Sequence, residues 1–189
     1  FIRGWKGRIS AGLYVKGIQL GSIETKPLGN CKLAVSVKTA QRPVYPYSGA
    51  SSATVVLSSI AFRLSSIKWD ENNETSVNIA RFLSGVGYGY FPSEGMMELE
   101  IYSGKMNLLE MSKNAVCATI RKIAGEMGAS ARVDVTSFMP VGDPVLNRAL
   151  VETLENVHGE LRIRTVHAST PDKTAVLNAM GIPCLLYTS

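Results

Sequence analysis

The sequence lacks any apolar run approaching the roughly 18 residues that a membrane span requires, and its first residues show no signal-peptide pattern. Cysteine is also scarce. Cys31, Cys117 and Cys184 are the three in the chain, and neither a C-x-x-C spacing nor a disulfide framework is present. These absences predict a cytoplasmic protein that works in a reducing compartment and has no membrane partner.

Concentrated positive charge is missing as well, although the net charge is +5. The 20 lysines and arginines are scattered, and no basic block is longer than Arg121-Lys122. Scattered charge is typical of a solvated surface, so no nucleic-acid partner is expected. The two histidines, His158 and His167, have no acidic partner at ligand spacing. The chain by itself is therefore expected to hold no zinc site and no cofactor.

What the chain does contain is 46% apolar residues, enough for a core, in an ordered pattern. Apolar residues alternate in four segments and recur at helical spacing in two others. In chain order these predict a strand at 32–38, a helix at 53–67, strands at 75–83 and 97–102, a helix at 107–127 and a strand at 131–138. Asn107 and Glu110 resemble a capping box at the start of the second helix. The order β-α-β-β-α-β is that of a ferredoxin-like domain, with two helices on one face of an antiparallel sheet.

The pattern changes after residue 140. Asp143 and Pro144 predict a helix to about Val157, a strand is predicted over 161–168, and a second helix is predicted from Pro171, with Thr170 as its cap and Gly181 at its end. Alternating helices and strands are typical of an α/β domain. The expected fold class is therefore α+β. A ferredoxin-like domain (30–140) is inserted into an incomplete α/β domain, to which residues 1–29 and 141–183 contribute.

Several short segments on this framework carry a family resemblance. They are Leu28-Gly29 leading into the strand 33–38, Tyr45–Ala53, Ser76–Pro92, Gly142–Leu146 and Ser169–Pro183. The last is similar to a "Ser/Thr-Asp-Ala … Gly-Ile-Pro" segment. Over residues 27–183 the chain resembles the zinc metallopeptidases and deacylases that include acetylornithine deacetylase, succinyl-diaminopimelate desuccinylase, aminoacylase and carboxypeptidase G.

This resemblance implies a lid or dimerisation domain at 30–140 within a zinc-binding catalytic domain. It implies a homodimer that pairs through the lids. It also implies hydrolysis of an amide bond in a small peptide or N-acyl amino acid, by a metal-activated water assisted by a glutamate. In the family, that glutamate and most zinc ligands precede the segment that begins here at Phe1, and a last histidine follows the segment ending at Pro183. We therefore expect zinc in the intact parent protein, and neither zinc nor activity in this chain alone.

The resemblance also assigns site positions. Arg42 stands where the family has a lid histidine that polarises the scissile carbonyl across the dimer. It is either an oxyanion-stabilising group or a solvated loop residue. Gly89 replaces an asparagine, and Tyr102 replaces an arginine that binds substrate carboxylate. Lys16 lies near an expected acidic metal ligand, and a protonated amine has no lone pair for zinc. Asp172 either favours its positive helix end or orients a metal ligand.

Two other interpretations stay open. The altered residues are compatible with a non-catalytic relative that acts as a scaffold or regulatory subunit. Alternatively, the segment Val86–Phe91 superficially resembles the aromatic signature of RNA-binding ferredoxin-like domains, in which Tyr88 or Tyr90 would stack on bases. Pro92 and the better strand at 97–102 count against this RNA-binding alternative.

Both ends predict a fragment. Phe1 is no initiator, and Phe1–Trp5 reads as the middle of a chain. Residues Cys184–Ser189 match what one reading frame of the mosaic-end adaptor of transposase-based sequencing libraries encodes. We therefore expect residues 184–189 to be non-native and leave them out of the predicted fold, with native sequence ending near Pro183.

Overall fold

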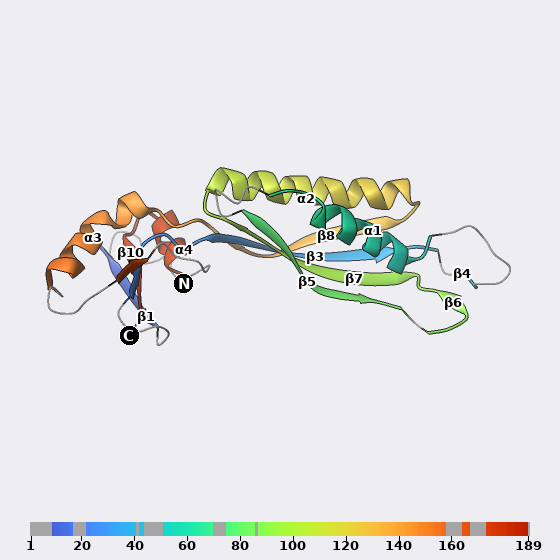
Figure 1. Ribbon diagram of the computed structural model, residues 1–189, viewed down its shortest axis with the longest axis horizontal. Helices are drawn as coiled ribbons and strands as arrows, with labels where there is room; N and C mark the ends of the chain where they lie inside the picture. Colours follow the sequence, from blue (N-terminus) through green and yellow to red (C-terminus); the bar gives the residue numbers. More distant parts are fainter. Residues whose placement is uncertain are drawn as a thin grey trace. The chain divides into compact units, whose positions relative to one another are not determined.

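The computed structural model describes residues 9–16, 22–40, 42–43, 51–69, 75–85, 87–157, 164–166 and 173–188. Figure 1 shows a chain of mixed helices and strands, and the strands form separate sheets. This arrangement confirms the predicted α+β class. The chain divides into two compact units. The terminal unit comprises residues 1–30, 103–106 and 139–189, and the inserted unit comprises residues 31–102 and 107–138.

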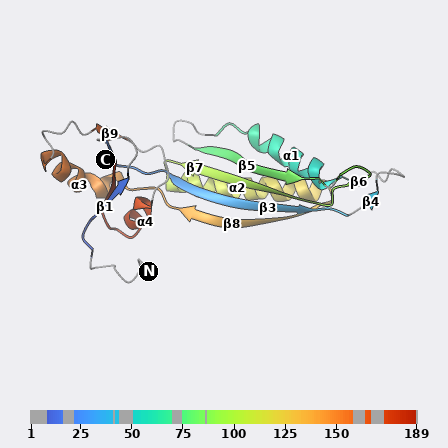
Figure 2. The same cartoon turned by 90° about the horizontal axis from the view of Figure 1, so that it is seen from below.

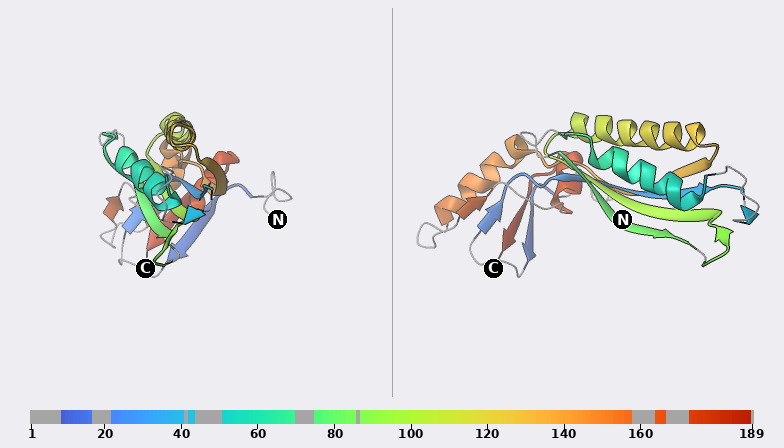
Figure 3. Two further views of the ribbon diagram at one scale, coloured as in Figure 1. Left: turned by 90° about the vertical axis from the view of Figure 1, so that its right-hand side faces the viewer. Right: turned by 45° about the vertical axis from the view of Figure 1, so that its right-hand side comes forward.

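The inserted unit is built on a four-stranded sheet in the order β5-β7-β3-β8. Its elements follow the chain as β3 (Gly29–Lys38), α1 (Ala53–Ser65), β5 (Ser76–Ser84), β7 (Glu94–Ser103), α2 (Met106–Glu126) and β8 (Ser130–Met139). Figure 2 looks onto the four strands, and Figure 3 shows α1 and α2 on one side of them. This arrangement is the predicted ferredoxin-like fold.

The core of this unit lies between the sheet and the two helices. Alternate residues of β3 and β7 point inward, and each helix contributes one apolar stripe. The side chains that are at most 1% exposed include Leu33, Val35, Val37, Leu57, Ile60, Leu64, Met97, Leu99, Ile101, Leu109, Val116 and Ile120. Burial of a side chain of this kind contributes about 1.5–3 kcal/mol, so these residues are the main reason that the unit folds.

The helix ends of the inserted unit follow the expected rules with one exception. Ser52 caps α1, because its hydroxyl accepts a hydrogen bond from the Val55 amide at 3.3 Å. Gly128, at φ +67°, ends α2 in a left-handed conformation. The exception is Asn107. The helix begins at Met106, so Asn107 lies in the first turn and is not the predicted cap.

The terminal unit contains a second sheet in the order β1-β10-β2-β9. Its strands are β1 (Gly12–Lys16), β2 (Ser22–Glu24), β9 (Arg164–Val166) and β10 (Cys184–Thr188). Strand β10 pairs with β1 in parallel and with β2 antiparallel, and Leu185 and Leu186 are buried. Residues 184–188 therefore do take part in the fold, because their apolar side chains suit a central strand. Their adaptor origin stays a prediction.

Two helices complete the terminal unit. Helix α3 (Pro144–Val157) starts as predicted, because the Asp143 carboxylate accepts hydrogen bonds from the amides of Val145 at 2.9 Å and Leu146 at 3.2 Å. Helix α4 (Thr174–Ala179) begins later than predicted, and Lys173 at its N-cap makes no side-chain cap bond. Gly181 ends it in the predicted left-handed conformation, at φ +78°.

Two short segments of the terminal unit, here called connectors, lead to and from the inserted unit. The first connector, residues 25–28, joins β2 to β3, and the second connector, residues 140–143, joins β8 to α3. They touch each other where the Gly142 amide donates to the Pro27 carbonyl at 2.8 Å. A Cβ atom on Gly142 would overlap the Pro27 ring, so only glycine permits this approach.

Replacement of Gly142 by alanine is expected to lower the free energy of unfolding by about 1–3 kcal/mol, because the added methyl group forces the connectors apart. Urea denaturation followed by circular dichroism measures this change. Gly125→Ala is the matched control. Gly125 lies inside α2 with open space at its Cβ position, so alanine there should stabilise the protein by roughly 0.5–1 kcal/mol. Equal effects at the two glycines would refute the steric explanation.

Candidate functional site

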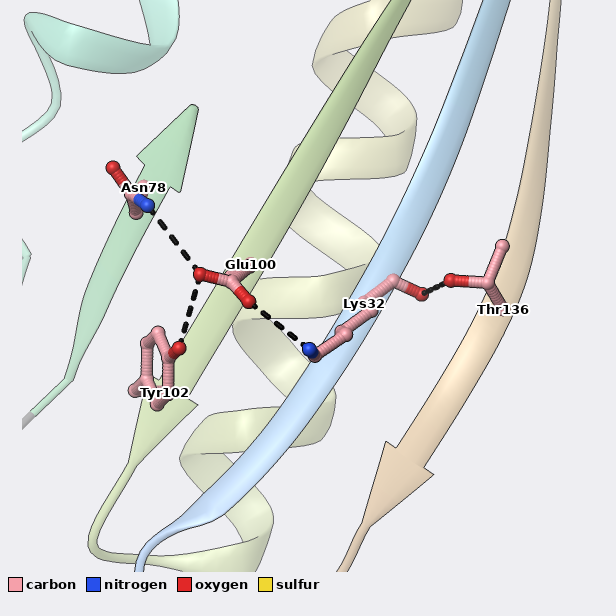
Figure 4. Close-up of polar contacts among 5 residues, drawn as sticks. All are labelled: Lys32, Asn78, Glu100, Tyr102 and Thr136. Carbon is pink, nitrogen blue, oxygen red and sulfur yellow. Dashed lines mark hydrogen bonds and ion pairs between the residues drawn. The ribbon is translucent and has the colours of Figure 1, made fainter. Parts of the chain in front are cut away.

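The open face of the inserted unit's sheet carries a polar cluster. Because Leu99 and Ile101 point into the core, Glu100 and Tyr102 point to the opposite face of β7. The Glu100 carboxylate accepts hydrogen bonds from the Tyr102 hydroxyl at 3.0 Å and the Asn78 amide nitrogen at 3.4 Å. Its other oxygen lies 3.2 Å from the Lys32 ammonium group. Figure 4 shows these residues meeting from β3, β5 and β7.

The cluster fixes the protonation of two groups. Partial burial alone raises the pKa of Glu100. The hydrogen bonds from Tyr102, Lys32 and Asn78, together with the charge of Lys32, outweigh burial and lower this pKa below its usual value. Burial and the neighbouring carboxylate raise the pKa of Tyr102. At neutral pH the cluster therefore holds a charged glutamate and a neutral phenol that donates its proton to it.

Substitution of Glu100 by glutamine is expected to lower the free energy of unfolding at pH 7 by about 1 kcal/mol, since a neutral amide replaces a charge-assisted acceptor. The folded-state pKa of Glu100 is depressed. Its contribution is therefore complete above the unfolded pKa and is lost as pH falls through the folded value. Urea denaturation over a series of pH values should show a difference between wild type and Glu100→Gln that is largest at pH 7 and shrinks as acid protonates Glu100. A difference that does not change with pH would contradict this origin.

Two hollows lie on the same open face. One of about 260 Å³ adjoins the polar cluster, and its lining includes Lys32, Ala34, Ala80, Glu98, Glu100 and Thr136. The other, of about 460 Å³, is lined mainly by apolar atoms, with Leu83 and Met96 beside the Lys38–Glu94 ion pair of 2.9 Å. These hollows can hold small groups by hydrogen bonding and apolar contact. Neither lining contains a histidine or cysteine that could act as a base or nucleophile.

The structure brings two of the predicted site positions together. Strand β4 (Arg42–Pro43) pairs antiparallel with β6 (Tyr90–Phe91), with Arg42 opposite Phe91. Gly89, at φ +90°, directly precedes β6 in a left-handed conformation that suits glycine. We call β4, β6 and Gly89 the tip ribbon. The positions assigned to the family's lid histidine and asparagine therefore lie on one small element.

Tyr102 lies apart from the tip ribbon. The chain passes from β6 into β7 at Glu94, and Tyr102 is near the other end of that strand. The eight residues of extended chain from Glu94 to Tyr102 place these two residues roughly 26 Å apart. One copy of the chain therefore cannot place Arg42 and Tyr102 against the same small substrate.

The remaining predicted residues fall in the terminal unit or outside the described residues. Lys16 ends β1 opposite Thr188 and is half-buried. Asp172, His158 and His167 lie outside the described residues. Within the described ranges no three His, Cys, Asp or Glu side chains are grouped so that they could hold a metal ion. These residues therefore do not fit the zinc ion that the resemblance implies.

The RNA-binding alternative required aromatic residues on the third strand of the sheet. That strand is β7, and Tyr88 lies before it in a turn between Gly87 and Gly89, both at positive φ. Tyr90 belongs to the two-stranded tip ribbon and not to the four-stranded sheet. The prediction that Tyr88 and Tyr90 lie on the third strand of the sheet, where they could stack on bases, is therefore wrong.

Among the described residues, no helix is both long enough and apolar enough to cross a bilayer.

Sequence reasoning missed three members of the polar cluster, namely Lys32, Asn78 and Glu100. A partial signal exists, because Glu98, Glu100 and Tyr102 alternate with buried apolar residues along β7. Lys32 and Asn78, however, become neighbours of Glu100 only through the pairing of three strands.

Neither a scan against protein-family profiles nor a search of curated proteins finds a match for this chain. Solved structures do match. A tripeptidase from Staphylococcus aureus superposes with a TM-score of 0.81 at 17% identity, over 95% of this chain and 48% of that one. Aminopeptidase PepT from Bacillus cereus gives 0.75 at 18% identity, over 97% and 50%.

An aminobenzoyl-glutamate utilization protein from Klebsiella pneumoniae gives a TM-score of 0.77 at 13% identity, over 98% of this chain and 52% of that one. The chain thus spans about half the length of the solved structures that it matches. At such low identity the similarity concerns the fold. The chain has the fold of the matched half of these peptidase and amidohydrolase structures, and its sequence resembles the same family.

Proposed function

We propose that this chain is the lid and an adjoining part of the catalytic domain of a hydrolase that cleaves an amide bond in a small peptide or N-acyl amino acid. The observation that carries the proposal is the superposition on a tripeptidase over 95% of the chain. The pairing of β4 with β6 supports it, because Arg42 and Gly89 occupy one ribbon, where the resemblance places two substrate-contacting groups.

Zinc is expected in the parent protein, but the described residues do not fit that ion, so no zinc-dependent step is assigned to this chain. The role that we assign to this chain is contact with the substrate. Arg42 carries a permanent positive charge, which can stabilise the negative charge that develops on the carbonyl oxygen during amide hydrolysis. Tyr102 stands at the position assigned to carboxylate binding, but its hydroxyl donates to Glu100, so it would have to leave Glu100 before it could donate to a substrate carboxylate.

We further propose a homodimer that forms through the inserted unit. A complete site needs the tip ribbon of one copy beside the β7 end of another, because the two lie far apart within one chain. Helix α1 supplies a suitable surface. Val55 and Phe62 are 51% and 77% exposed, and Phe62 follows Val55 by seven residues on the same side of the helix.

The polar groups on this side of α1 are satisfied locally. The Ser59 hydroxyl donates to the Val55 carbonyl at 2.9 Å, and the Ser66 hydroxyl donates to the Phe62 carbonyl at 2.7 Å. A partner can therefore cover these serines without leaving a buried hydroxyl donor unsatisfied. We call Val55, Ser59 and Phe62 the α1 face. It contains no charge and lies along β5, an edge strand of the sheet.

The test of the hydrolase is an assay of the protein encoded by the complete gene on dipeptides, tripeptides and N-acyl amino acids, before and after chelation. Turnover that chelation abolishes supports the proposal. The 189-residue chain assayed beside it should show no turnover and should retain no stoichiometric zinc after dialysis against a weak chelator. Stoichiometric zinc in this chain would contradict the assignment.

A non-catalytic scaffold or regulatory subunit is the second candidate. It is favoured by the residue types at the assigned positions, where Lys16, Gly89 and Tyr102 replace groups that bind metal or substrate in the family. Complete absence of turnover in a full-length protein whose upstream zinc ligands are intact would replace the hydrolase with this candidate.

A further inference from the structure

Two asparagines in the terminal unit form a reciprocal pair. The Asn147 side-chain nitrogen donates to the Asn178 oxygen at 2.9 Å, and the Asn178 nitrogen donates to the Asn147 oxygen at 3.0 Å. Asn147 is fully buried and Asn178 is 5% exposed. An amide buried this deeply is costly unless its hydrogen bonds are made, so the partners of the pair decide what it does.

The other hydrogen bonds of both side-chain amides are made to backbone groups. Asn147 donates its second hydrogen to the Thr25 carbonyl at 3.1 Å and accepts from the Cys184 amide at 2.9 Å. Asn178 shares its second hydrogen between the Ile182 carbonyl at 3.1 Å and the Cys184 carbonyl at 3.4 Å, and it accepts from the Asp143 amide at 3.1 Å. Each side chain thus makes the two donor and two acceptor bonds that an amide can make, and neither can rotate without losing several of them.

These partners include both connectors. Thr25 belongs to the first connector and Asp143 to the second, and the asparagines themselves come from α3 and α4. The Gly142 amide also binds the Pro27 carbonyl directly. A pair of apolar side chains could fill the same space, but it could not bind the two connectors through their backbone groups.

We propose that Asn147 and Asn178 are a clamp that fixes both connectors to the terminal unit, so that residues 25–28 and 140–143 move with that unit as one body. The contacts to residue 184 use backbone atoms only, so the clamp does not depend on which side chain stands there. This inference is independent of the proposed hydrolase activity.

Residual dipolar couplings of the 189-residue chain test the clamp directly, because they report which rigid body each amide belongs to. The amides of Gly142 and Asp143 should fit the alignment tensor defined by α3 together with α4 and β10, called the α3 tensor, whereas the amides of β3, β7 and α2 should define the tensor of the inserted unit. Asn178→Ala and Asn147→Ala should release Gly142 and Asp143 from the α3 tensor and speed their hydrogen exchange at least tenfold. Asn114→Ala, on the exposed side of α2, should change neither.

Wild-type couplings for Gly142 and Asp143 that fit the inserted unit, or neither unit, overturn the proposal without any mutation. It is also overturned if the Asn178→Ala chain keeps wild-type couplings and exchange at these two amides. Should the alanine variants fail to fold, Asn147→Ser is the milder variant. A serine hydroxyl keeps one donor and can accept, so partial release of Asp143 with normal exchange at Leu99 is then expected.

Discussion

Replacement of Arg42 by alanine in the complete protein is expected to lower kcat/KM for amide hydrolysis about 10²–10³-fold, the usual effect of losing one oxyanion-stabilising donor. The tip ribbon places Arg42 opposite Phe91, two residues after Gly89 in the chain. A guanidinium stays charged at every working pH. The loss should therefore be independent of pH in the neutral range, unlike the loss of a titrating histidine.

Two variants separate this role from a general effect of charge. Arg42→Lys keeps the charge but not the planar fork, so an intermediate loss is expected. Arg81→Ala removes an exposed arginine of β5, whose guanidinium lies 3.6 Å from Glu98, and should leave kcat/KM within about twofold. If Arg42→Ala alters the free energy of unfolding by less than about 0.5 kcal/mol and leaves kcat/KM unchanged, Arg42 is a solvated loop residue.

The fold was predictable because its signals are local. The alternation around Leu99 and the helical spacing around Leu57 specify their elements without reference to distant residues, and both side chains are buried as expected. Element ends were less predictable. Asn107 has the residue type of a cap, yet α2 starts one residue earlier, at Met106. Helix ends fray, so a residue type that favours a cap fixes the first residue of a helix only to within one or two positions.

The sites were harder to predict because they depend on partners distant in the sequence. Lys32 and Glu100 are separated by 68 positions and meet only across two strands. Asn147 and Asn178 lie in two helices with no apolar pattern that marks them as buried. By contrast, Arg42 and Gly89 were placed by resemblance to known motifs, and the pairing of β4 with β6 later brought them together.

Substitution of Phe62 by glutamate is expected to convert the proposed dimer into a monomer. Exposed aromatic side chains at the centre of an interface commonly contribute at least 2 kcal/mol, which corresponds to a rise in the dimer dissociation constant of about thirtyfold or more. Phe62 is 77% exposed, so glutamate at this position should leave the fold of the free chain intact. Two copies would instead bury two unpaired carboxylates against each other.

Sedimentation of the 189-residue chain over a concentration series measures the effect, with circular dichroism as a check on folding. Met111→Glu is the matched control, since Met111 is 64% exposed on α2, outside the α1 face. It should leave the dissociation constant within about twofold, because surface substitutions away from an interface have small effects. A wild-type chain that stays monomeric at high concentration contradicts the dimer. Equal weakening by Phe62→Glu and Met111→Glu would show that the two copies meet through a surface other than the α1 face.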